Sequence, residues 1–265
     1  MAILHINVPY PILLQRIDFV IKNRIHPEIY FSADSLDAFE EDEGRRTAEA
    51  LRERGLEVSF HGPFMDLSPG GTDPRIREVT ADRLARTLDI ARIFRPGSIV
   101  FHPGYEKWKF NGNVGLWLKS SLDTWRCLAK RAGEMGTVIA LENVFEETPE
   151  PLKALLGEIG SSSLRWCFDS GHQRVFSKTP TAQWFEALGD YLHEMHLHDN
   201  RGEMDDHLPA GEGGFDFAEL FDLLDRRGLH PVYTIEPHEE AHLWKGLKAV
   251  REFLDRRTLR PGEAP

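Results

Sequence analysis

The sequence has few of the features expected of a disulfide-bonded, membrane-anchored or exported protein. Its 265 residues include only two cysteines, Cys127 and Cys167, which show neither CxxC spacing nor a paired framework. Such sparse use of cysteine is typical of a reducing cytoplasm. No apolar run approaches the roughly 20 residues that span a bilayer, and no basic segment followed by a long apolar stretch opens the chain. We therefore expect a cytoplasmic protein without a membrane partner.

Positive charge is also scarce. The chain has 43 acidic residues against 32 lysines and arginines, a formal net charge of −11. An acidic surface repels phosphate backbones unless a local basic patch offsets it, which disfavours a nucleic-acid partner. Part of the acidic total would be neutralised if carboxylates bind cations. A chain of this length is long enough to bury a large core in one domain.

Apolar runs of strand length alternate with longer helical patterns. The expected strands are rich in Ile, Val, Phe and Leu and occupy 2–8, 28–31, 57–61, 98–102, 137–142, 164–169, 192–196 and 232–236. Helical spacing of apolar residues covers 45–54, 76–94, 114–136, 151–159, 181–188, 217–227 and 241–256. Glycines that can end a helix precede several strands, at Gly55, Gly97, Gly136 and Gly228. The alternation predicts an α/β fold, a single-domain (β/α)₈ TIM barrel over 1–258, with a frayed tail over 259–265.

Metal-ligand residue types recur where the expected strands end. These are His61, His102, Glu142, Asp169, His196 and Glu236. The separations repeat: 41 residues from His61 to His102, 40 from His102 to Glu142, 27 to Asp169, 27 to His196 and 40 to Glu236. Each interval matches about one strand–loop–helix unit. Because the carboxyl ends of barrel strands converge on the axis, these side chains should meet in one pocket.

Several carboxylates in one pocket repel each other and lose hydration, and divalent cations relieve both penalties. Mixed Asp, Glu and His ligation suits Mn²⁺, Zn²⁺, Co²⁺ or Fe²⁺ better than Ca²⁺, with Mg²⁺ a further option. We predict that Glu142, Asp169, His196 and Glu236 share a cation. Other residues are either further ligands or contacts to the substrate, namely His61, His102, His172, Asp205 and His207. Two long loops, 106–113 and 200–214, are expected to be functional.

The order of motifs resembles a known group of barrels. HGPF, FHPG, LEN, FDSGH, HLHDN, DxHLPxGEG and IEP are similar to the xylose isomerase-like barrel superfamily, over roughly residues 3 to 255. That superfamily contains sugar isomerases and epimerases, hydroxypyruvate isomerase, inosose dehydratase and endonuclease IV. The motifs are specific for the superfamily and poorly specific for the reaction. Related barrels often pair or form tetramers, so a homo-oligomer is an open expectation.

The resemblance to tagatose and psicose epimerases implies one metal, often Mn²⁺, bound by Glu142, Asp169, His196 and Glu236. It also implies that Glu142 and Glu236 act as acid and base on opposite faces of a carbohydrate. His172 and, more loosely, Arg201 correspond to residues that contact substrate oxygens. The resemblance to endonuclease IV implies three zinc ions instead, with all nine ligand types present at His61, His102, Glu142, Asp169, His172, His196, Asp205, His207 and Glu236.

These motifs are consistent with two alternative functions. The first is isomerisation or epimerisation of a small sugar, sugar phosphate or related polyhydroxy carbonyl compound, which needs two bases flanking the substrate. Trp108 and Lys107 are expected to contact that substrate. The alternative is zinc-dependent phosphodiester hydrolysis at abasic sites in DNA. A DNA enzyme needs a basic surface around its pocket, whereas the loops after the second, fifth and eighth strands are acidic or neutral. We therefore favour the small-molecule enzyme.

Overall fold

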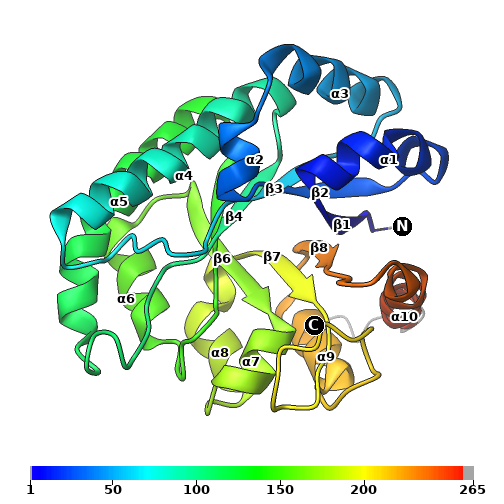
Figure 1. The fold of residues 1–265 in the computed structure, drawn as a ribbon. Coiled ribbons are helices and arrows are strands. Elements are labelled where there is room, and N and C mark those ends of the chain that lie inside the picture. The colour runs from blue at the N-terminus through cyan, green and yellow to red at the C-terminus, as the bar shows by residue number, and fades with distance from the viewer. Residues whose placement is uncertain (1, 259–265) are drawn as a thin grey trace.

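Eight parallel strands close into a barrel surrounded by helices (Figure 1). The computed structural model describes residues 2–258. The strands are β1 (Leu4–Pro9), β2 (His26–Tyr30), β3 (Ser59–His61), β4 (Ser98–Phe101), β5 (Val138–Glu142), β6 (Leu164–Asp169), β7 (Leu192–Leu197) and β8 (Val232–Ile235). Each strand pairs with the next in sequence, and β1 pairs with β8, so the ring has no free edge. The predicted (β/α)₈ barrel is confirmed; the predicted tail, 259–265, lies outside the described residues.

Helices follow the strands and cover the outside of the barrel. They are α1 (Tyr10–Lys22), α2 (Ala33–Asp37), α3 (Glu41–Glu53), α4 (Pro74–Phe94), α5 (Val114–Met135), α6 (Glu150–Ile159), α7 (Ser170–Phe176), α8 (Thr181–Leu188), α9 (Phe217–Arg227) and α10 (Glu240–Thr258), with a 3₁₀ turn, η1 (Gly189–Tyr191). Within residues 2–258, none of these helices has the length and apolar character needed to cross a membrane.

The structure adds elements that the sequence patterns did not predict. Helix α1 begins directly after β1 with no intervening loop, and Pro11 stands in its first turn, where a missing N–H costs nothing. Helix α7 begins at the end of β6, where the Asp169 carboxylate accepts a hydrogen bond from the His172 amide at 2.6 Å.

The end of α4 also differs from the prediction. Arg95, not Gly97, adopts the left-handed conformation there, with φ 55°.

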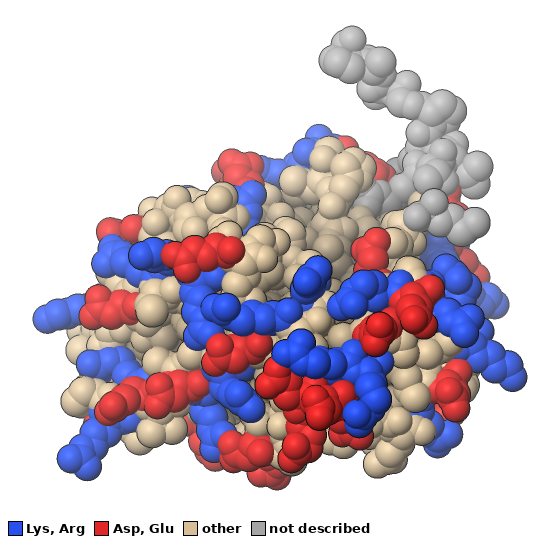
Figure 2. All heavy atoms as spheres, turned by 90° about the horizontal axis from the view of Figure 1, so that it is seen from above, with Lys and Arg blue, Asp and Glu red and all other residues tan. Residues whose placement is uncertain are grey.

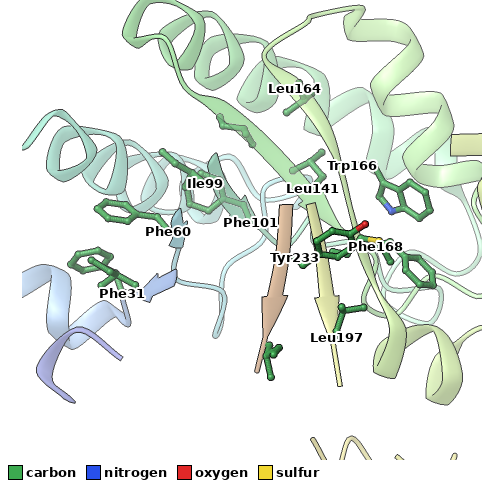
Figure 3. Packing of buried hydrophobic residues seen from close by; sticks show 14 of the residues in the cluster. Phe31, Phe60, Ile99, Phe101, Leu141, Leu164, Trp166, Phe168, Leu197 and Tyr233 are labelled. Carbon is green, nitrogen blue, oxygen red and sulfur yellow. The ribbon is translucent and has the colours of Figure 1, made fainter. Parts of the chain in front are cut away.

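The hydrophobic core lies between the strands and the helices. Figure 3 shows Phe60, Ile99 and Phe101 of β3 and β4 gathered on one side, with Trp166 and Phe168 of β6 on the other. All five side chains are fully buried. Aromatic side chains of this size each bury a large apolar area, so this layer stabilises the ring of strands and, with it, the positions of the strand ends.

The outer surface carries charges of both signs. On the face shown in Figure 2, Lys and Arg side chains are interspersed with Asp and Glu side chains. Ion pairs between neighbouring helices include Arg131 with Asp89 and Arg83 with Asp37. Exposed pairs of this kind add little stability, about 0–1 kcal/mol each, so the fold depends on its core.

Candidate metal centre and active site

The carboxyl ends of the strands surround a cavity of about 1070 Å³. Its lining includes most of the predicted ligands: His61, His102, Glu142, His172, Asp205, His207 and Glu236. Asp169 and His196 are fully buried beneath them. Strand register explains this grouping, because Asp169 on β6 lies directly beside His196 on β7. Barrel closure therefore brings together side chains that are up to 175 residues apart, from His61 to Glu236.

The centre of the site is the Nδ1 atom of His196. It lies 3.3 Å from Glu236 Oε1, 3.5 Å from Glu142 Oε2 and 3.9 Å from Asp169 Oδ2. This nitrogen is buried and makes no hydrogen bond. A buried nitrogen without a partner that faces three carboxylates is costly unless a proton or a cation lies between them. Three carboxylate oxygens and one imidazole nitrogen fit a divalent transition metal such as Mn²⁺ or Zn²⁺.

A second group of donors lies beside this centre and shares Glu142. His61 Nε2 is 3.2 Å and His102 Nε2 is 3.4 Å from Glu142 Oε2. The three residues form one of the clusters whose ligand atoms lie within 4.8 Å of each other. Phe64 stacks on the His102 ring, with centroids 4.4 Å apart, and limits its rotation.

A third group surrounds Asp205, in the long loop after β7. Asp205 Oδ2 lies 3.0 Å from His207 Nε2 and 3.3 Å from His172 Nε2. His198 also belongs here, with Nδ1 3.6 Å from Asp205 Oδ1 and Nε2 2.9 Å from Asp169 Oδ2. From the sequence, His198 is only an undecided candidate for supporting the ligands or contacting substrate; the structure places it directly after β7, next to Asp169 and Asp205. The nine predicted ligands thus occupy one continuous site.

Charge in this site is balanced between imidazoles and carboxylates. Burial alone would raise the pKa of Glu142, but His196, His102 and His172 hold that pKa well below its usual range. Burial would lower the pKa of His196 and of His172. The Cys167 sulfur and the surrounding carboxylates raise the pKa of His196, and carboxylates raise that of His172, both well above the ordinary value. Burial raises the pKa of Glu236. Protons on His172 and His196 would offset these carboxylates when no cation is bound, so metal binding would release protons.

The loop over 200–214 is organised by Asp199, which lies just after β7. Its carboxylate accepts hydrogen bonds from the backbone amides of Asn200, Gly211, Gly213, Gly214 and Phe215, at 2.8 to 3.0 Å. A Cβ on Gly213 would lie 2.3 Å from the Asn200 carbonyl oxygen, so the loop packs tightly around this carboxylate. Asp199 thereby places Asp205 and His207 over the cavity.

We expect Asp199→Asn to lower the free energy of unfolding by about 2–4 kcal/mol. The amide nitrogen would face N–H donors in place of a carboxylate oxygen and leave them unpaired. Urea unfolding would measure the loss, with Asp206→Asn in the same loop as the matched control, expected to change stability by less than about 0.5 kcal/mol. Equal effects of the two variants would contradict the role given to Asp199.

Glu146 is a second carboxyl that sequence analysis missed. Its Oε2 accepts a hydrogen bond from the Val144 amide at 2.7 Å, while Oε1 is buried without a partner. Burial raises the pKa of Glu146 to about 7. Between pH 4.5 and 7 the folded protein therefore binds this proton more tightly than the unfolded chain does, and stability falls as pH rises.

Glu146→Gln should remove this part of the pH dependence. The span from 4.5 to about 7 corresponds to at most about 3.5 kcal/mol, at roughly 1.4 kcal/mol for each pKa unit. Urea unfolding at pH 5 and pH 8 would show a smaller loss of stability in Glu146→Gln than in the wild type. Glu158→Gln, at an exposed position of α6, should keep the wild-type difference. An unchanged pH dependence in Glu146→Gln would show that this carboxyl is ionised throughout.

Three residues predicted to contact substrate lie outside the cavity lining. Trp108 is 87% exposed, and Lys107 forms an ion pair with Glu147 at 2.7 Å. The side chain of Arg201 is exposed in the loop after β7. Contact between these residues and a substrate stays a prediction. His172, the fourth predicted contact, does line the cavity.

Comparisons with known proteins agree with this architecture. A family model described as xylose isomerase-like TIM barrel matches residues 28–257. The uncharacterised protein MJ1311 of Methanocaldococcus jannaschii is 30% identical over 215 residues, which cover 77% of this chain and 73% of that protein. The TTHB071 protein from Thermus thermophilus, in a structure soaked with ZnCl₂, is 26% identical with a TM-score of 0.76, covering 96% of this chain and 98% of that one.

A D-tagatose 3-epimerase-like protein has the same fold, with a TM-score of 0.81 at 24% identity, covering 96% of this chain and 98% of that one. The family match spans nearly the whole barrel, and MJ1311 covers more than two thirds of the chain at 30% identity. On this evidence, the chain belongs to the xylose isomerase-like TIM barrel family.

Proposed function

We propose that this protein is a metal-dependent isomerase or epimerase acting on a small polyhydroxy carbonyl compound. The observation that carries the proposal is the placement of Glu142 and Glu236. Both line the same cavity, and each approaches the Nδ1 atom of His196, at 3.5 and 3.3 Å. Glu142 ends β5 and Glu236 directly follows β8, three strands apart in a ring of eight, so they would approach a substrate bound between them from different sides.

A divalent cation held by Glu142, Asp169, His196 and Glu236 would polarise a substrate carbonyl and lower the pKa of the neighbouring C–H. Neighbouring imidazoles hold the pKa of Glu142 low, so its carboxylate is ionised and is assigned here as the group that accepts this proton. The C–H electron pair then delocalises into an enediolate. Glu236, whose pKa is raised, donates a proton to the opposite face for epimerisation, or to the adjacent carbon for isomerisation.

The lysine and arginine side chains that line the cavity favour a neutral substrate over a sugar phosphate. Among the described residues that line it, the lysines and arginines are Arg16 and Lys109. Arg16 lies 3.9 Å from Glu240 and Lys109 lies 3.9 Å from Glu106, so acidic neighbours already offset both charges. A site built for a phosphate group would present convergent, unpaired donors.

Exchange of substrate hydrogen with solvent tests the proposal. The Mn²⁺-loaded protein would be incubated in ²H₂O with ketopentoses and ketohexoses, and proton NMR would follow the C–H next to the carbonyl. Removal and return of this proton by the glutamates predicts deuterium incorporation together with a second isomer. No incorporation with any sugar of the panel would contradict the proposed chemistry.

The second candidate is phosphodiester hydrolysis with three zinc ions. It is favoured by one observation, the three adjoining donor groups that share Glu142 and Asp169. Clustered metals of this kind activate water and stabilise a leaving oxygen. Nicking of an abasic-site duplex by the Zn²⁺-loaded protein, together with three zinc ions per chain in elemental analysis, would support this function over the isomerase.

A further inference from the structure

Glu28 is a buried carboxylate that the proposed chemistry leaves without a role. It lies on β2, inside the barrel, and its side chain has no exposed surface. Its Oε2 atom is 3.1 Å from Nε2 of His196, and its Oε1 accepts a hydrogen bond from Asn7 Nδ2 at 3.2 Å. Burying a charge this deeply is expensive unless its partners need it.

The two nitrogens of His196 have different surroundings. Nε2 points down the barrel to Glu28, whereas Nδ1 points up to the carboxylates of Glu142, Asp169 and Glu236 and makes no hydrogen bond. An ionised carboxylate only accepts hydrogen bonds, so Nε2 must carry a proton to satisfy it. In the neutral ring, the lone pair is then on Nδ1, facing the predicted cation.

We propose that Glu28 is a positioning residue that fixes the tautomer and ring orientation of His196 and makes Nδ1 a stronger metal ligand. A carboxylate behind a ligating imidazole is a recurrent device, and its loss typically weakens metal binding by about 10–100-fold. Asn7 holds the other oxygen of Glu28 in place. The inference rests on the metal site of the proposed function but concerns metal affinity, not turnover.

Glu194 provides a matched control. It is also fully buried inside the barrel, on β7, two residues before His196. Its two oxygens accept hydrogen bonds from hydroxyl groups, at 2.6 Å from Ser98 and 2.8 Å from Thr234. Glu194 therefore has its own partners and no hydrogen bond to the His196 ring in the described structure. A general effect of replacing a buried carboxyl group would appear in both glutamates, whereas a positioning effect would appear in Glu28 alone.

Titration calorimetry with Mn²⁺ would compare Glu28→Gln, Glu194→Gln and the wild type. We expect Glu28→Gln to weaken Mn²⁺ binding by about 10–100-fold and Glu194→Gln by less than about 3-fold. Asn7→Ala is a milder test that keeps both buried carboxyl groups, and it should weaken binding by less than Glu28→Gln does. Equal affinities for Glu28→Gln and the wild type, or equal losses in the two Gln variants, would overturn the inference.

A measurement without metal separates this inference from the proposed function. In metal-free protein with ¹⁵N-labelled histidine, NMR should show His196 protonated on Nε2 at high pH, and Glu28→Gln should weaken that preference. If the tautomer and affinity change as expected while no sugar is turned over, the inference stands and the isomerase proposal fails. If sugars are epimerised by a Glu28→Gln variant of wild-type Mn²⁺ affinity, the inference fails and the proposed function stands.

Discussion

Replacing Glu142 with glutamine is expected to lower kcat on the identified substrate by at least about 10³-fold. Glu142 has two duties in the proposed chemistry, as a ligand of the cation and as the base that accepts the substrate proton. General base catalysis alone contributes about 10²–10⁴-fold, and the amide of glutamine can neither accept that proton nor neutralise a cation. The side chain is 1% exposed, so solvent cannot replace the lost charge.

Glu158→Gln is the control for this prediction, since Glu158 is exposed on α6 and its variant should keep kcat within about 2-fold of wild type. Steady-state kinetics at saturating Mn²⁺ would give kcat, and circular dichroism would verify that Glu142→Gln folds. Wild-type-like turnover by a folded Glu142→Gln variant would rule out the assigned base.

Removing divalent cations should abolish turnover and lower the melting temperature by roughly 5–10 °C. Glu142, Asp169 and Glu236 gather around one imidazole nitrogen in a buried site. A cation that binds only the folded state stabilises it by about 2.7 kcal/mol at 100 times its Kd. For a chain of this size each kcal/mol shifts the melting temperature by about 2–4 °C.

Calorimetry in EDTA and after return of Mn²⁺ would measure this shift. Ca²⁺ is the matched control, because it prefers oxygen ligands and should restore less stability at a site that contains imidazole nitrogen. His196→Ala should also reduce the response to Mn²⁺. A melting temperature that is the same in EDTA and in Mn²⁺ would show that these four side chains do not share a cation.

Much of the barrel and its ligand set is predictable from the chain alone. The alternation of short apolar runs with helical patterns indicates the eight strands, because strands buried on both faces need apolar residues throughout. The repeated spacing of His61, His102, Glu142, Asp169, His196 and Glu236 places them at successive strand ends. Both inferences use local pattern and chain order, which do not depend on how side chains are oriented.

The tertiary structure was needed to identify the carboxylates inside the barrel and the contacts that hold the loop after β7. Glu28 and Glu194 sit within strand segments, and nothing local indicates that these carboxylates point into the barrel toward His196 and its neighbours. The role of Asp199 depends on a loop that folds back on it.

The sequence by itself therefore determined the fold and the residue types at the strand ends, through periodicity and spacing. Only the closed barrel decided which nitrogen of His196 faces the carboxylates and which buried groups support it, because these contacts join residues as far apart as Glu28 and His196. Hydrogen-bond direction and side-chain orientation depend on distances between strands, and those exist only once the ring has closed.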